Sequence, residues 1–166
     1  PVVKTFKVLA NSRHTVVVHD VNEGVGRNQE VAAKVESTNG VGIVVERPMY
    51  FRYTGSMGSV DGAHNAKGVS GPATDWYFAE GYTGLGFDEY LTILNPDVNH
   101  ALIQLTYYLK DGGVVTKDLF VTNRTRFTIA VHDTNKGVGR NQEVAVKVIS
   151  NVPIIVERPM YFILNQ

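Results

Sequence analysis

The sequence predicts an all-β protein, a β-sandwich of short antiparallel strands that is built from an internal repeat of about one and a half units. Valine is abundant, and 8 tyrosines and 7 phenylalanines add flat side chains that pack well on a pleated sheet. Apolar and polar residues alternate with period two over many short segments, and no window carries a capped helical period. One long segment also occurs twice, which is typical of repeat proteins.

The repeat consists of two nearly identical segments. Residues 18–35 read VHDVNEGVGRNQEVAAKV and residues 131–148 read VHDTNKGVGRNQEVAVKV, so only three positions differ. The identity resumes further along in both segments, at VERPMYF. We call residues 13–51 the first copy and residues 126–162 the second copy.

The residues between the copies occur once, so the chain holds two C-terminal halves and one N-terminal half of a repeat unit. We expect residues 1–53 to be the C-terminal half of a first unit, residues 54–71 a glycine-rich linker, and residues 72–166 a complete second unit. A half without its partner leaves strand edges or a core face uncovered. The first half is therefore expected to be completed by strands of a neighbouring repeat or of another subunit.

Strands are expected wherever the period-two pattern holds. They fall at 2–9, 14–19, 31–36, 42–46, 75–80, 89–94, 100–109, 114–121, 144–148 and 153–157. Asn95-Pro96-Asp97 and Asp111-Gly112-Gly113 carry the residues of tight turns. Because proline cannot donate to a ladder, the ERPMYF strand of each copy should lie at an edge or begin after a bulge.

Charge and composition exclude several classes of function. The 16 lysines and arginines equal the 16 aspartates and glutamates, so the basic excess of a nucleic-acid binder or an anionic-membrane binder is missing. No apolar run approaches the roughly 20 residues that span a bilayer. The sequence has no cysteine, which removes disulfides, thiolate metal sites and cysteine nucleophiles. We expect no cofactor and no metal.

Two motifs invite a phosphate or metal interpretation. GVGRNQ, present in both copies, lacks the third glycine and the Lys-Ser/Thr ending of a phosphate loop, and no helix follows it. His19-Asp20 and His132-Asp133 place neighbouring side chains on opposite faces of a strand, so that one ion cannot easily bind both. A structural role at turns and strand ends is the preferred interpretation for each.

Carboxylates supply a third candidate chemistry. Glu80, Asp88 and Glu89 could form the pair of a glycosidase. A carboxylate that is partly buried and paired with an arginine, such as Arg47 or Arg158, is the simpler interpretation, because lone buried charges must be paired.

Aromatic and polar residues supply the remaining candidates. Trp76, Tyr77, Tyr82 and Tyr90 could form a platform for a sugar, although alternating aromatic residues more often belong to a core. Asn123 begins an Asn-Arg-Thr triplet, which fits the glycosylation acceptor pattern. Hydrogen bonds across a unit junction are expected from six polar residues, namely Asp61, His64, Asn65, Glu80, Arg47 and Arg158.

Several motifs together resemble a known family. They are WYFAEG at 76–81, GFDEYLTILNP at 86–96, Ala10-Asn11-Ser12-Arg13 and the two ERPMYF segments. This set resembles a tandemly repeated β domain of unassigned function from surface proteins of actinobacteria and other, often thermophilic, bacteria. The resemblance covers nearly the whole chain and implies an extracellular or cell-surface location and a modular, non-catalytic role.

The sequence therefore predicts a non-catalytic extracellular structural or assembly module, such as a segment of a filament, sheath, stalk or adhesin. Its expected partners are neighbouring repeats or copies of itself, with no nucleic acid and no membrane insertion. The alternative is a carbohydrate-binding module on a cell-wall-associated protein, with cell-surface polysaccharide as its partner. A hydrolase that uses Glu80 and Asp88 is a third interpretation.

Overall fold

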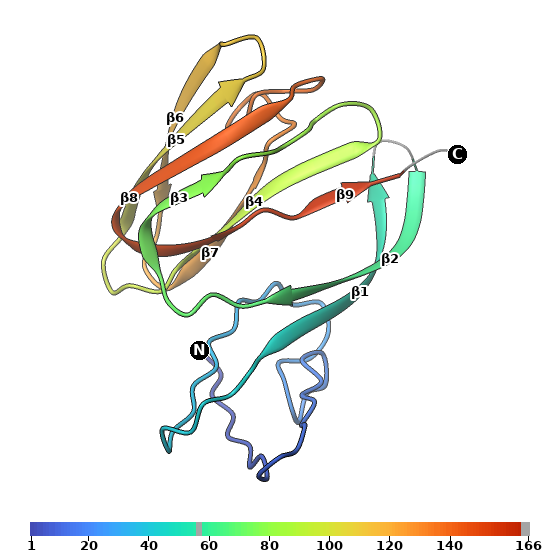
Figure 1. Ribbon diagram of the computed structural model, residues 1–166, viewed down its shortest axis with the longest axis vertical. Coiled ribbons are helices and arrows are strands. Elements are labelled where there is room, and N and C mark those ends of the chain that lie inside the picture. Colours follow the sequence, from blue (N-terminus) through green and yellow to red (C-terminus); the bar gives the residue numbers. More distant parts are fainter. Residues whose placement is uncertain (56–57, 164–166) are drawn as a thin grey trace. The chain divides into compact units, whose positions relative to one another are not determined.

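A computed structural model describes residues 1–55 and 58–163 and shows an all-β protein whose strands pair in antiparallel fashion (Figure 1). The predicted all-β sandwich is confirmed. Grouped by their contacts in space, the residues form two compact units, residues 1–34 and residues 35–166. Within the described residues, no helix has the length and apolar character that crossing a membrane requires.

Nine strands are formed by the described residues. They are β1 (Glu46–Gly55), β2 (Gly58–Lys67), β3 (Ala73–Phe78), β4 (Phe87–Asn95), β5 (Ala101–Leu109), β6 (Val114–Val121), β7 (Thr125–Ala130), β8 (Val144–Glu157) and β9 (Met160–Phe162).

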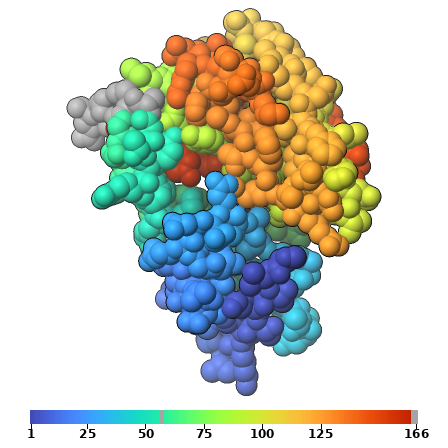
Figure 2. Space-filling model, turned by 180° about the vertical axis from the view of Figure 1, so that it is seen from behind, coloured from blue at the N-terminus to red at the C-terminus, as the bar shows by residue number. Residues whose placement is uncertain are grey.

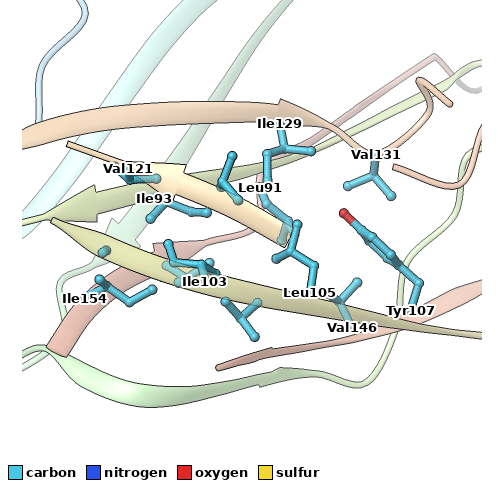
Figure 3. Close-up of a cluster of buried hydrophobic side chains, with 14 of the residues drawn as sticks. Leu91, Ile93, Ile103, Leu105, Tyr107, Val121, Ile129, Val131, Val146 and Ile154 are labelled. Atoms are coloured by element: carbon cyan, nitrogen blue, oxygen red, sulfur yellow. The ribbon is translucent and has the colours of Figure 1, made fainter. Parts of the chain in front are cut away.

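Strands β3 to β9 form the sandwich, in the order β6-β5-β8-β4-β7, with β3 added to β8 and β9 added to β4. The long strand β8 joins both layers, because residues 144–150 pair with β5 while residues 155–157 pair with β4. Aliphatic side chains alternate inward along these strands, and the buried ones meet between the layers (Figure 3). Each such side chain stabilises the fold by about 1.5–3 kcal/mol through burial.

The second unit also contains a hairpin of β1 and β2, with a register that runs from Glu46 opposite Lys67 to Gly55 opposite Gly58. The segment predicted as a linker, 54–71, therefore contains a full strand, and it lies inside the second compact unit. One of its glycines is required for packing, because a Cβ at Gly62 would lie 2.7 Å from Cζ of Phe51 on the opposite strand. Glycines placed for close approach look like flexibility in a sequence.

Residues 1–45 contain turns and no strand. The strands predicted at 2–9, 14–19 and 31–36 are therefore wrong, and the one predicted at 42–46 begins only at Glu46. A strand needs a partner strand. Strands β4 and β5, with which the first copy could pair, already pair with β7 and β8 of the second copy. Most residues of the first unit are exposed, and Figure 2 draws this unit in blue.

The predicted turns and proline positions agree with the structure. Asp111 to Gly113 joins β5 to β6, with Gly112 at a φ of 88°. Pro48 lies in the two-stranded hairpin, where both strands are edges, and Pro159 falls in the break between β8 and β9. Neither proline therefore interrupts a central ladder.

Candidate functional site

The candidate site is the contact between the second copy and the segment that leads into strand β4. We call this contact the seat, and its main residues are Thr83, Asp88, Glu89, His132 and Arg140. The part from the second copy is a turn, residues 131–143, which we call the GVGR turn. Within it the N–H of Gly137 donates to the carbonyl of Asp133 at 3.0 Å, and the N–H of Val138 donates to that of Val131 at 2.9 Å. A Cβ at position 137 would lie 2.1 Å from the carbonyl oxygen of Val131, so only glycine fits there.

The GVGR turn holds Thr83, which is completely buried between β3 and β4 in the chain. The Thr83 hydroxyl donates to the carbonyl of Gly139 at 2.7 Å and accepts from the N–H of Gln142 at 3.0 Å. The backbone of Thr83 donates to Gln142 at 2.9 Å and accepts from the N–H of Asn141 at 3.1 Å. These four bonds satisfy every polar group of a buried threonine, so they fix the position of the turn.

Asp88 on β4 is the charged centre of the seat, and it is almost fully buried. Nη2 of Arg140 lies 2.5 Å from Oδ1 of Asp88, and Nη1 donates to the carbonyl of Phe87 at 2.7 Å. Nε2 of His132 lies 3.9 Å from the same carboxylate oxygen, and its Nδ1 is 3.1 Å from the carbonyl of Glu89. A buried carboxylate costs several kcal/mol without such partners, so Arg140 and His132 tie the second copy to β4.

The hairpin β1–β2 meets the same carboxylate from another direction. The hydroxyl of Tyr53 donates to Oδ2 of Asp88 at 2.8 Å and lies 2.9 Å from the hydroxyl of Tyr90. The ring of Tyr53 stacks on that of Tyr161 with centroids 4.3 Å apart, and Phe51 meets Tyr161 edge-on at 5.1 Å. Burial raises the pKa of Tyr53, so its hydroxyl stays protonated and remains a donor. Asp88 thus joins hairpin, sandwich and GVGR turn.

Glu89, the next residue on β4, points to the opposite face and is completely buried. Burial raises the pKa of Glu89 to about 7, and the charge of Arg158 and the N–H of Tyr82 only partly offset this. The carboxyl group lies against Gly81, where a Cβ would be 2.4 Å from Oε1. The side chain is therefore held in a confined position that favours its protonated form.

The predicted aromatic platform is not assembled. Trp76 is half-buried against the core and its Nε1–H donates to the carbonyl of Ile154 at 3.1 Å, whereas its neighbour Tyr77 points outward beneath Nζ of Lys147. Tyr82 meets Phe87 edge-on. Tyr90 belongs to the group around Asp88.

The predicted junction residues are also separated. Asp61 forms an exposed ion pair with Arg52 at 2.7 Å, while His64 lies on the other face of β2, near Phe51. Asn65 is exposed, on the face of Asp61. The three therefore do not form one polar group, because the segment is a strand with two faces rather than a loop.

The two predicted arginines, Arg47 and Arg158, contact groups other than the carboxylate of Glu80. Arg47 on β1 pairs with Glu157 on β8 at 3.2 Å and so links the hairpin to the sandwich. Arg158 donates to the backbone carbonyl oxygen of Glu80, whose side chain is exposed. Asn123 lies half-buried in the turn between β6 and β7, and its N–H donates to Nδ1 of His100 at 3.2 Å.

The outer face of β6, β5 and β8 carries a shallow groove of about 700 Å³. The apolar side chains at its surface are Leu102, Phe120 and Ile149, and all three are exposed. The polar ones are Gln104, Asp118 and Asn151. Neither Asp88 nor Glu89 lines this groove.

Sequence reasoning missed the grouping around Asp88. The sequence patterns place Asp88 among the carboxylate candidates and His132 in a His-Asp pair. Arg140 enters only as part of the GVGRNQ motif, and no pattern indicates Tyr53. The signal that could have found the group is the repeat itself, because the turn residues His132 and Arg140 recur unchanged as His19 and Arg27.

No protein-family model matches the chain, and none of the curated proteins matches it. Solved structures that match part of the chain include the Anabaena sensory rhodopsin transducer, which is 28 % identical in sequence. The match has a TM-score of 0.48 and covers 55 % of this chain and 100 % of that one. Another is Thermotoga maritima 1070, 18 % identical, with a TM-score of 0.46 over 57 % of this chain and 96 % of that one.

Proposed function

We propose that the chain is a non-catalytic extracellular structural module, a segment of a filament, sheath, stalk or adhesin, in which C-terminal and N-terminal halves of repeat units complement one another. The observation that supports this most directly is the different burial of matched side chains in the two copies. Val18 and Val35 are 43 % and 57 % exposed, whereas their counterparts Val131 and Val148 are both 0 % exposed. The first copy therefore has the apolar side chains of a sandwich half, but they are exposed, whereas the same side chains in the second copy are buried.

Four other matched aliphatic positions behave in the same way. The exposed residues are Val16, Val31, Ile43 and Val45, and their buried counterparts are Ile129, Val144, Ile154 and Val156. Six aliphatic side chains left at a surface in one stretch of chain favour association, because burying them releases free energy.

The polar groups near Asp88 support a structural role for the site. Asp88 receives the hydroxyl of Tyr53 and the guanidinium of Arg140, which come from two segments far apart in sequence. A carboxylate that is buried and shared in this way holds segments together. The extracellular location is proposed from the resemblance of the WYFAEG and ERPMYF motifs to repeats of surface proteins.

Hydrogen exchange combined with light scattering tests the proposal. Backbone amides of 14–19 and 31–36 should exchange rapidly in a monomer, and they should become protected when a half of another repeat unit covers them. The corresponding amides of the second copy should be protected in both cases. A monomer whose first copy is fully protected would overturn complementation, and turnover of a polysaccharide by the purified chain would overturn the non-catalytic role.

A carbohydrate-binding module is the second candidate, and the groove on β6, β5 and β8 is the observation that favours it. Phe120 is exposed there and lies 5.0 Å from the ring of His100, while Gln104 and Asp118 offer hydrogen-bonding groups. Binding on a glycan array that is lost in Phe120→Ala, with the fold intact, would favour this candidate. Equal binding by Phe120→Ala and the parent chain would count against it.

A further inference from the structure

Resting on the proposed function of complementing halves, we propose that the first copy binds a half unit of the kind formed by residues 73–121, in the same register in which the second copy binds that half here. The partner is thus a four-stranded half with a buried aspartate, a buried threonine and an aliphatic inner face. It belongs to another repeat unit.

The first argument is that the residues that seat the second copy are the same in the first. Arg140 and His132 hold Asp88, and their counterparts Arg27 and His19 are identical. The three residues that clamp Thr83 through backbone groups, Gly139, Asn141 and Gln142, recur as Gly26, Asn28 and Gln29. A partner with an aspartate and a threonine at these places would therefore find every donor and acceptor that the second copy offers.

The second argument is that the turn of the first copy already has its seated geometry. The N–H of Gly24 donates to Asp20 at 2.8 Å and the N–H of Val25 donates to Val18 at 2.9 Å, as in the GVGR turn. The φ angles of Gly26 and Asn28 are 85° and 60°, against 83° and 63° at the corresponding residues of the second copy. Because the turn is formed before binding, little ordering of this part is required when a partner arrives.

The third argument concerns where the partner comes from. Each chain has one 73–121 half and two segments that fit it, and the second copy occupies that half. Any number of these 166-residue chains therefore leaves one fitting segment per chain without a half. The half that binds the first copy must come from outside these residues, from another repeat unit.

One difference between the copies indicates how the partner differs from residues 73–121. Val146 is buried opposite Tyr107 on β5 and Phe78 on β3, but its counterpart in the first copy is Ala33. Alanine lacks the two methyl groups of valine, so the partner half is expected to carry a larger side chain at one of those two facing positions.

The chain's own half can serve as the probe if the second copy is expelled from it. Val148→Asp places a charge at a buried position opposite Leu105, and Val35→Asp is the matched change at the exposed counterpart. Val35→Asp alone should leave cooperative unfolding unchanged. Val148→Asp should still unfold cooperatively, with the first copy on the half, and the double variant should be unfolded. Trp76, the single tryptophan, reports on these states because it contacts β8.

A disulfide identifies which copy occupies the half, since the chain has no native cysteine. Gln104 lies opposite Ile149, whose counterpart in the first copy is Glu36, so Gln104→Cys with Glu36→Cys should oxidise in the Val148→Asp background. Gln104→Cys with Ile149→Cys in the parent chain is the control for geometry. Adding Ala33→Val should increase the yield of the Glu36→Cys disulfide, because it restores the methyl groups that fit this half.

The outcomes separate clearly. A disulfide between positions 36 and 104, with cooperative unfolding, supports the proposal, and its mass on a gel tells exchange within one chain from exchange between chains. A Val148→Asp protein that is as unfolded as the double variant, or one that is folded without this disulfide, overturns it. Rapid hydrogen exchange in the parent first copy would still stand in that case, so the failure would concern the partner and not the proposed function.

Discussion

The first and second copies have the same turn but not the same strands. Gly26 and Gly139 adopt the same positive φ, and the same pair of backbone bonds closes each turn. Yet the second copy contributes β7, β8 and β9 to the sandwich, while residues 1–45 form no strand. The turn is thus determined by nearby residues, whereas the strands are determined by what lies beside them.

The physical reason is the range of the interactions. An Asp side chain, a glycine under a carbonyl and a residue at positive φ are all contained within about ten residues of chain. A strand is stabilised by hydrogen bonds and side-chain pairs with a neighbour that is remote in sequence, and its own propensity is weak. Near-identity of sequence therefore transfers the turn and leaves the strand dependent on a partner.

The largest contrast is expected from the two arginines. Arg140→Ala would leave Asp88 buried without its closest cation, and we expect a loss of about 3 kcal/mol in the free energy of unfolding. Arg27→Ala, the matched change in the first copy, should alter it by less than about 0.5 kcal/mol. Urea unfolding followed by Trp76 fluorescence measures both. Equal losses would mean that the first copy is also seated in the isolated chain.

A smaller contrast is expected from truncation of matched valines. Val148→Ala removes two buried methyl groups from the core and should cost about 2 kcal/mol, whereas Val35→Ala should cost less than about 0.5 kcal/mol. The same urea experiment applies. A substantial loss in Val35→Ala would show that residue 35 is buried in solution and would weaken the comparison.

The pH dependence of the seat sharpens the comparison, because it should affect one copy only. Glu89 has a pKa of about 7 in the folded chain, above its ordinary value of 4.5, so the folded state retains a proton that the unfolded state releases between these values. The stability that protonated Glu89 contributes should therefore be fully present below pH 4.5 and be lost as the pH rises through 7.

Glu89→Gln removes this titration. At pH 8 the variant should be more stable than the parent by about 2 kcal/mol, and at pH 4 the two should be similar. Amide exchange in the parent should rise in the second copy between pH 5 and 8 beyond its intrinsic increase, and should not do so in the first. If Glu89→Gln kept the parent's dependence of stability on pH, the titration would not belong to Glu89.

The smallest effect is expected at the hairpin β1–β2, where part of the first copy has found a partner strand. Arg52 and Asp61 form an ion pair at 2.7 Å, but both side chains are largely exposed. Water screens such pairs, so Arg52→Ala should leave the unfolding midpoint unchanged within error. Tyr53→Phe is the useful companion, because loss of its bond to Asp88 should lower the midpoint measurably.

Sequence reasoning located the elements of the sandwich well and the site poorly. The strands predicted at 100–109 and 114–121 agree with β5 and β6 within one residue, because alternation and a glycine turn define them locally. The sequence does not indicate the hairpin β1–β2, because Gly62, which lies against the ring of Phe51 on the facing strand, looks like a flexible loop residue. Such an arrangement is visible only when two strands are paired.

The site could not be predicted because its parts come from separate stretches of chain. Tyr53, Asp88 and Arg140 are about 35 and 50 residues apart in sequence, and no spacing rule connects them. Only the fold brings them to one carboxylate. The repeat did indicate that the turn residues matter, but not what they touch.

The path of β8 through both layers has a mechanical consequence. Antiparallel hydrogen bonds run perpendicular to their strands, so tension along β8 would load its bonds to β5 and β4 together, in shear. Tension applied to Glu46 and Lys67, at the open end of the hairpin β1–β2, would instead break its bonds one pair after another, like a zipper. A chain under load would therefore extend first by opening the hairpin, while the sandwich remained closed.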